Sequence, residues 1–204
     1  MGYNPQKPGR PWHAYHSYFI ANLRMVMDVE VAAGNETAAA YAQPEWWSLL
    51  EEMPQAAHPQ FLRGDCSWGN ERAMEGAEPR GIAYLFKLKQ SAHGKKRIAK
   101  LFGNEQWMYA GQNGQGLETQ LRLSGWSRER RVVVLRRALR EAVAEEQKSP
   151  QKAAPQLTLD LPEATYRGVL YEYAVWVTSL PDEVRTIAQH YRNRATQAVR
   201  PARA

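Results

Sequence analysis

One short stretch, Phe-Leu-Arg-Gly-Asp-Cys-Ser-Trp-Gly at positions 61–69, limits the possible folds more than any other part of the sequence. Its apolar beginning has the composition of a short strand, and Gly64 and Asp65 end that strand before polar residues that favour the start of a helix. A strand followed by a helix places Asp65 at the carboxyl edge of a sheet, where α/β folds usually hold ligands and metal ions. Two interpretations follow: Asp65 is a metal-binding acid, or it caps a helix that opens near Ser67.

The residues on both sides of this stretch predict alternating strands and helices. Within 16–31, Met25, Met27, Val29 and Val31 stand at alternate positions with polar Asp28 and Glu30 between them. This is typical of a strand, and the length of the segment fits two adjacent strands. Further elements are predicted at 36–52 (one or two helices), 61–65 (a strand), 70–77 (a short helix) and 82–88 (a strand). The order of two strands, helix, strand, helix and strand indicates a mixed α/β sheet with helices on its faces.

The second half of the chain is richer in strand patterns. The run Arg-Arg-Val-Val-Val-Leu-Arg-Arg at 130–137 has a β-branched centre and favours a strand. A helix over 128–147 remains an alternative, because Leu135, Leu139 and Val143 are spaced four residues apart. The other predicted elements are strands at 117–123 and 171–180 and a final helix that begins after Pro181.

The composition predicts a soluble globular chain with an excess of positive charge. Lysine and arginine outnumber the acidic residues by 27 to 21, which gives a net charge of +6 and suits a polyanionic partner such as DNA. The lone Cys66 excludes an internal disulfide bond and is typical of a reducing compartment. No apolar stretch has the length of a signal sequence or a membrane span, so we expect a cytoplasmic protein without a membrane partner.

Clustered basic residues are candidates for contacting DNA. Lys7 and Arg10 lie in a proline-rich loop, and Lys95 and Lys96 lie in a basic segment. A larger set extends this segment with Arg97, Lys100 and the arginines at 128, 130, 131, 136 and 137. If these residues share one surface, they predict DNA binding that is independent of sequence and falls steeply with salt. The alternative is a dispersed set of solvated charges.

Several stretches of the sequence resemble the DDE transposases of bacterial insertion sequences. They are Gly-Tyr-Asn-Pro-Gln-Lys-Pro-Gly-Arg-Pro (2–11), the stretch at 61–69, Tyr-Leu-Phe-Lys-Leu-Lys (84–89), the arginine-flanked run at 130–137, Tyr-Glu-Tyr-Ala-Val-Trp-Val-Thr-Ser-Leu (171–180) and Ile-Ala-Gln-His-Tyr-Arg-Asn-Arg-Ala (187–195). The resemblance implies an RNase H-like mixed sheet with flanking helices. It divides the chain into a partial catalytic core (1–90), a mostly β insertion (91–170), and a strand and final helix that return to the core (171–204).

The resemblance also implies a chemistry. In this family three carboxylates hold two divalent ions, Mg²⁺ or Mn²⁺, for the cleavage of transposon ends and their transfer into DNA. Asp65 matches the second of these acids, which implies a catalytic and metal-binding role for it. Tyr191 and Arg194 match the first two positions of the family's Tyr-x2-Arg-x3-Glu-x6-Lys signature on the last helix, which implies that they contact DNA.

The sequence departs from the family at both ends. The family's first acid lies on a strand before the Gly-Tyr-Asn-Pro segment, whereas this chain begins at Met1. Ala198 stands at the glutamate position of the signature, and the lysine position falls one residue after Ala204. We therefore expect a transposase truncated at both ends that is inactive alone. The alternative is a non-catalytic fragment that binds DNA, a full-length transposase or itself, and so interferes with transposition.

The truncation has a consequence for folding. The first strand of an RNase H-like sheet is central, so its absence is expected to leave the strands within 16–31 and 61–65 beside a gap. These strands are then expected to keep unpaired edges and exposed apolar faces.

Overall fold

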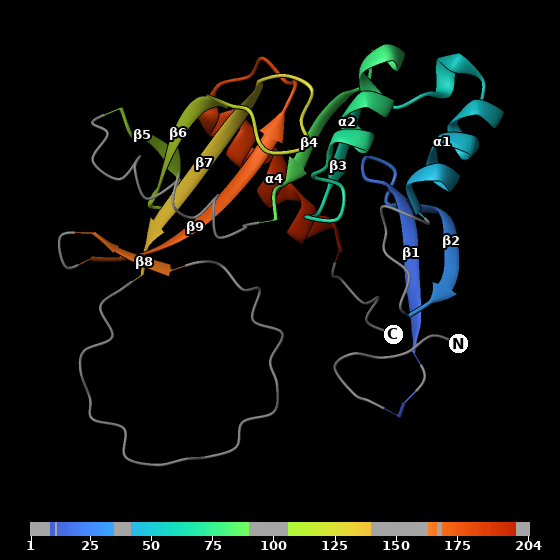
Figure 1. The fold of residues 1–204 in the computed structure, drawn as a ribbon, viewed down its shortest axis with the longest axis horizontal. Coiled ribbons are helices and arrows are strands. Elements are labelled where there is room, and N and C mark those ends of the chain that lie inside the picture. The colour runs from blue at the N-terminus through green and yellow to red at the C-terminus, as the bar shows by residue number, and fades with distance from the viewer. Residues whose placement is uncertain are drawn as a thin grey trace.

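A computed structural model describes residues 9–10, 12–34, 42–89, 106–139, 163–166 and 169–198. These residues form a mixed α/β structure with a two-stranded sheet, a seven-stranded sheet and helices (Figure 1), which confirms the predicted α/β class. The strands are β1 (His13–Ile20), β2 (Met25–Ala33), β3 (Phe61–Gly64), β4 (Ala83–Lys87), β5 (Met108–Gly111), β6 (Gly114–Leu121), β7 (Arg130–Ala138), β8 (Glu163–Tyr166) and β9 (Val169–Thr178). The α-helices are α1 (Ala42–Glu52), α2 (Glu71–Ala77) and α4 (Val184–Ala198).

The larger sheet has the strand order β3-β4-β9-β7-β6-β5, and β8 pairs with β9. Strands β3 and β4 are parallel, whereas the other neighbouring pairs are antiparallel. Strands from the first half of the chain therefore hydrogen-bond directly to strands from the second half, through the pairing of β4 with β9. The alternative helix over 128–147 is wrong for its described part, because 130–138 forms the strand β7.

The three consecutive valines of β7 are explained by its central position. Val132 and Val134 belong to the core between the sheet and helices α1 and α2, and Val133 belongs to the core between the sheet and α4. All three side chains are fully buried. A strand covered on both faces needs apolar residues at every position rather than at alternate ones, and the local sequence satisfies that need.

Helix α4 packs on the face of the sheet opposite α1 and α2. Its Val184, Ile187 and Ala188 are buried against Leu85 and Trp176 of the sheet. Gly116 of β6 permits the close approach, because a Cβ atom there would lie 2.2 Å from Cγ1 of Val184. The apolar face predicted for the last helix is thus the face that holds it to the sheet.

Strands β1 and β2 form a separate antiparallel hairpin beside the larger sheet (Figure 1). Helix α1 covers one of its faces: the Tyr18 ring packs on Trp46 at 5.2 Å between centroids, and the Tyr18 hydroxyl donates to the carbonyl of Ala42 at 2.7 Å. Among the described strands, the hairpin pairs only with itself and β3 pairs only with β4. The expected unpaired strand edges are therefore present in the described residues.

Candidate functional site

Asp65 directly follows β3 at the carboxyl edge of the parallel pair β3–β4. Its Oδ1 atom accepts a hydrogen bond from the backbone N–H of Ser67 at 2.9 Å, and its carbonyl accepts one from the N–H of Trp68 at 3.1 Å. The side chain is half-buried. Asp65 thus closes a tight turn through one carboxylate oxygen at the edge where a metal ion would be expected in an α/β sheet.

The helix-capping interpretation of Asp65 is wrong. Helix α2 begins at Glu71, and its N-cap is Asn70, whose side chain accepts a hydrogen bond from the N–H of Ala73 at 3.1 Å. The sequence did contain this signal, because Asn is as good an N-cap as Asp and stands directly before the first helical residue. Asp65 lies too far upstream to reach the unsatisfied N–H groups of the helix.

Two glycines fix the turn that carries Asp65. A Cβ atom at Gly64 would lie 2.4 Å from Cβ of Trp68, and one at Gly69 would lie 2.3 Å from the carbonyl oxygen of Lys87 at the end of β4. The turn also receives a hydrogen bond from α1, because Nε2 of the buried Gln43 donates to the carbonyl of Ser67 at 3.2 Å. Asp65 is therefore held by contacts with β4 and α1 rather than by its own strand alone.

Helix α4 lies beside β3. Nη1 of Arg63 donates to the carbonyl of His190 at 2.6 Å, and the Phe61 and His190 rings are 5.4 Å apart. Strand β9 is antiparallel to β4, and α4 reverses direction after β9, so α4 runs in the same general direction as β3 and β4. Figure 1 shows the last turns of α4 at the end of the sheet where β3 and β4 finish. Position 198, the last helical position, therefore lies toward the edge that carries Asp65.

The remaining predicted site residues are not gathered around Asp65 in the described structure. Tyr191 is half-buried, and its ring packs on Trp176 of β9 at 4.6 Å. Arg10 is exposed at the start of the described chain. Lys7, Lys95 and Lys96 lie outside the described residues, and Arg194 is described only as a backbone position of α4. No group of three or more His, Cys, Asp or Glu side chains suited to a metal ion occurs in the described part of the chain.

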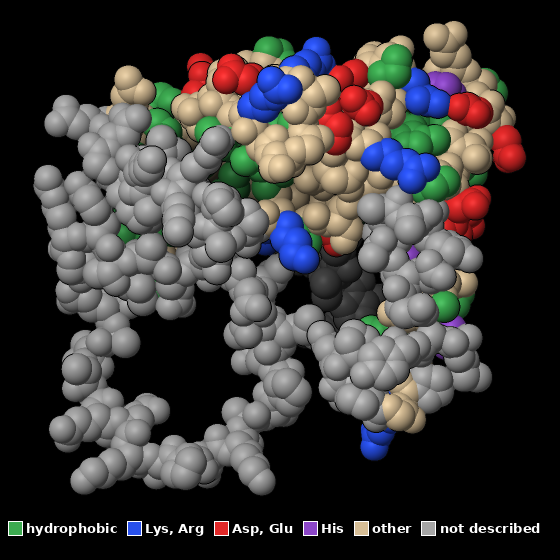
Figure 2. Space-filling model, viewed as in Figure 1, with side chains coloured by type: hydrophobic (Ala, Val, Ile, Leu, Met, Phe, Trp, Pro, Cys, Tyr) green, Lys and Arg blue, Asp and Glu red, His purple; other side chains and the backbone are tan. Residues whose placement is uncertain are grey.

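The arginines around β7 do not share one surface, so of the two alternatives for the larger basic set the structure favours dispersed charges at these positions. Alternate residues of a strand face opposite sides, so Arg130 and Arg136 point to one face of the sheet and Arg131 and Arg137 point to the other. Most of these arginines are also paired with acids: Arg128 with Glu78 at 2.6 Å, Arg130 with Glu71 at 2.9 Å, Arg131 with Glu118 at 2.5 Å and Arg137 with Glu172 at 2.7 Å. Figure 2 shows acidic and basic side chains intermixed on the viewed face.

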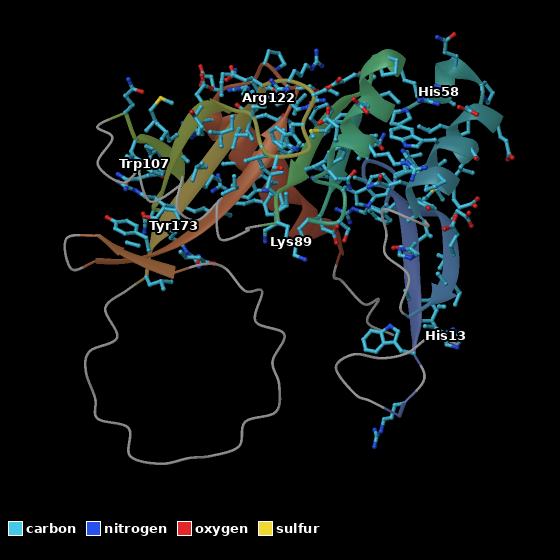
Figure 3. All side chains as sticks on the ribbon, viewed as in Figure 1. His13, His58, Lys89, Trp107, Arg122 and Tyr173 are labelled. Carbon is cyan, nitrogen blue, oxygen red and sulfur yellow. The ribbon has the colours of Figure 1, made fainter. Side chains whose placement is uncertain are left out.

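Arg136 is buried in an aromatic setting instead. Its guanidinium carbon lies 3.9 Å from the ring centre of Trp107 and 4.8 Å from that of Tyr171, and its Nε donates to Oε1 of Gln115 at 2.8 Å. Figure 3 shows Trp107 and Tyr173 at this end of the sheet. A guanidinium stacked between two rings contributes to packing and is not available to a phosphate in this arrangement.

A buried ionic network around Arg130 joins α2 to β7, and sequence reasoning missed it. The Arg130 side chain is 3% exposed and pairs with both Glu71 and Glu78, while the Tyr84 hydroxyl donates to Oε1 of Glu78 at 3.0 Å. Burial alone would raise the pKa of Glu71, but hydrogen bonds from Arg130 and Ser127 outweigh it and lower the pKa to about 2. These contacts tie the first residue of α2, Glu71, and also Glu78 to Arg130 of β7 and Tyr84 of β4, so the network has a structural role.

Comparisons of the chain with protein-family models, curated proteins and solved structures gave no match in any of the three. No helix in the described ranges combines the length and apolar character that crossing a membrane requires. The functional assignment therefore rests on the residues and their geometry.

Proposed function

We propose that this chain is part of a DDE-type DNA transposase with an RNase H-like core, in which Asp65 supplies one of the metal-binding carboxylates. The observation that carries the proposal is that β3 and α4 lie side by side. The Arg63–His190 hydrogen bond joins them, and both elements run toward the edge of the sheet where Asp65 lies. The signature position 198 then comes to the same edge as the acid at 65, as a shared metal site requires. The order of strands and helices is compatible with such a core.

The acids in the described residues do not fit a complete two-metal site. Two hard cations between reacting oxygens need several carboxylate ligands, and Asp65 has no described group of acids around it. Ala198 offers no ligand at the position where the family carries glutamate. In addition, Oδ1 of Asp65 already accepts a hydrogen bond from the backbone N–H of Ser67. For the chain by itself the proposal is therefore binding without catalysis, with DNA, a full-length transposase or a second copy as the partner.

The chain as given is expected not to cut or join DNA, because a single carboxylate cannot position Mg²⁺ against both the attacking and the leaving oxygen. The measurement is nicking of a supercoiled plasmid by the purified chain in Mg²⁺ or Mn²⁺. Metal-dependent nicking that disappears in Asp65→Ala would contradict this prediction, whereas nicking that survives in that variant would indicate a contaminating nuclease.

Restoring an acid at position 198 is expected to create measurable metal binding. Ala198→Glu would add a second carboxylate at the edge of Asp65, and we expect its Mn²⁺ affinity to exceed that of the unaltered chain by about tenfold or more, because affinity for hard cations rises with the number of charged oxygen ligands. Electron paramagnetic resonance of free Mn²⁺ measures this directly.

Two matched variants make the metal test specific. Thr196→Glu adds the same charge two positions away, roughly on the opposite side of an ideal helix, and should not tighten binding. Asp65→Asn combined with Ala198→Glu should return the affinity to that of the unaltered chain. Equal tightening by Thr196→Glu and Ala198→Glu would show that the gain is non-specific, and would remove the support for a shared site.

A further inference from the structure

The hairpin of β1 and β2 has an apolar face that no described element covers. The strand register pairs Tyr15 with Val31, Ser17 with Val29 and Phe19 with Val26 on the face away from α1. We call these residues the outer strip. The exposed fractions are 71% for Tyr15, 58% for Val31, 56% for Val26, 48% for Val29 and 43% for Phe19.

The distribution of polar and apolar residues in this hairpin is the reverse of what a solvated sheet face needs. A sheet with one free face normally places polar side chains toward water and apolar ones toward the core. Here the register places His16, Asp28 and Glu30 on the same face as Tyr18, which α1 covers, while the outer strip carries no charge. An isolated two-stranded hairpin is also only marginally stable. The outer strip is therefore a surface suited to being covered.

We propose that the outer strip of one chain packs against the outer strip of a second copy, with the two hairpins running in opposite directions. Side chains of these sizes and exposures amount to roughly 500 Å² of apolar surface, at the upper end of what an ordinary monomer exposes in one patch. Two such strips together bury roughly 1,000 Å², which is the lower bound for a specific interface. An interface at this lower bound is expected to be reversible, so the dimer should dissociate on dilution.

The chemistry of the strip favours a second copy as the occupant. The strip is uncharged, so bringing two of them together creates no repulsion between like charges. Its aromatic residues lie at the ends and its small residues, Ser17 and Val29, lie at the centre. With the hairpins antiparallel, Tyr15 of each copy faces Phe19 of the other, and the small side chains meet at the two-fold axis. A second copy is one of the partners named under the proposed function, and the outer strip supplies a surface for that contact. A dimer through this strip could be present or absent whether or not the chain is part of a transposase.

The test is sedimentation velocity of the complete chain over a micromolar concentration range, which is expected to show a monomer converting to a dimer. Val29→Glu places a charge at the centre of the strip and should weaken the dimer by at least about 100-fold, because two buried and unpaired charges would face each other. The matched control is Tyr109→Glu, which replaces another exposed apolar residue on β5, far along the chain from the hairpin, and should leave the association unchanged. Circular dichroism checks that both variants keep the fold.

A cross-link gives an independent measurement that does not rely on weakening the dimer. Ser17→Cys in a Cys66→Ser background is expected to form a disulfide-linked dimer on mild oxidation, and Tyr109→Cys in the same background is not. A dimer lost only in Val29→Glu and cross-linked only through position 17 supports the proposal. A chain that stays monomeric at all concentrations overturns the proposal and assigns the strip to another protein or another segment. Open-ended aggregation overturns it as well, and so does a dimer that Val29→Glu does not weaken.

Discussion

Replacing Arg130 with methionine is expected to lower the free energy of unfolding by about 3–5 kcal/mol. The substitution removes the guanidinium that pairs with both Glu71 and Glu78, and these carboxylates remain largely buried. The Glu71 and Glu78 side chains are only 17% and 23% exposed, and both lie against Arg130. Methionine fills a similar volume, so the loss is electrostatic rather than a packing defect. Urea unfolding followed by circular dichroism measures the change. A loss below about 1 kcal/mol would show that the network contributes little.

The same strand supplies the control for Arg130. Arg137→Met removes an arginine that is paired with Glu172 but is 61% exposed, and its expected cost is below about 1 kcal/mol.

The pH dependence of stability gives a second readout for Arg130. The pKa of Glu71 is lowered to about 2 in the folded chain, so this contribution is complete above about pH 5 and is lost as the pH falls toward 2. Arg130→Met should lack most of that acid-sensitive component.

Amide hydrogen exchange is expected to be much faster in residues 16–31 and 61–65 than in 117–135 and 171–180. The hairpin forms a separate two-stranded sheet and β3 is an edge strand, whereas β7 and β9 lie inside the larger sheet with both neighbours present. Edge elements with few partners open at a lower cost than central strands, so we expect opening free energies lower by about 2–3 kcal/mol in the first set.

The exchange measurement should be made below the concentration at which the chain dimerises, because covering the outer strip would protect the hairpin. Equal protection across both sets of segments would show that the structure closes without any further strand, and the expectation of a gap beside β1 and β3 would have to be abandoned.

The sequence predicted the elements well where local pattern and final environment agree. The strand pattern predicted within 16–31 corresponds to the hairpin, and the β-branched run at 130–137 forms β7 because its valines are buried on both sides of the sheet. Strand order could not be predicted in the same way. The pairing of β4 with β9 joins residues about 90 positions apart, and such contacts leave no local pattern in the sequence.

In the candidate site, too, some features could be predicted from the local sequence and others could not. The placement of Asp65 at the end of a strand was predictable from Gly64 and the residues after it, and the structure confirms that placement. The sequence left open whether the arginines of β7 form one patch. A count of charges could not decide this, because it does not show that alternate residues of a strand face opposite sides or which acids from other elements pair with each arginine. Glu71 and Glu78 lie more than 50 residues before Arg130 in the chain, so only the fold reveals their pairing.

The claim that position 198 and Asp65 share one edge is tested most directly by a distance measurement. Cys66, the only cysteine in the sequence, adjoins Asp65 and accepts a nitroxide label, and Ala198→Cys accepts a second one. Acids that share two metal ions about 4 Å apart lie within about 8 Å of each other, so strong dipolar broadening of the spectrum is expected for this pair. Arg185→Cys, at the exposed start of α4 and roughly 20 Å along the helix from position 198, should give none with Cys66. Broadening for the 66–198 pair alone is the result predicted here, and its absence, or equal broadening for both pairs, would contradict a shared metal-binding edge.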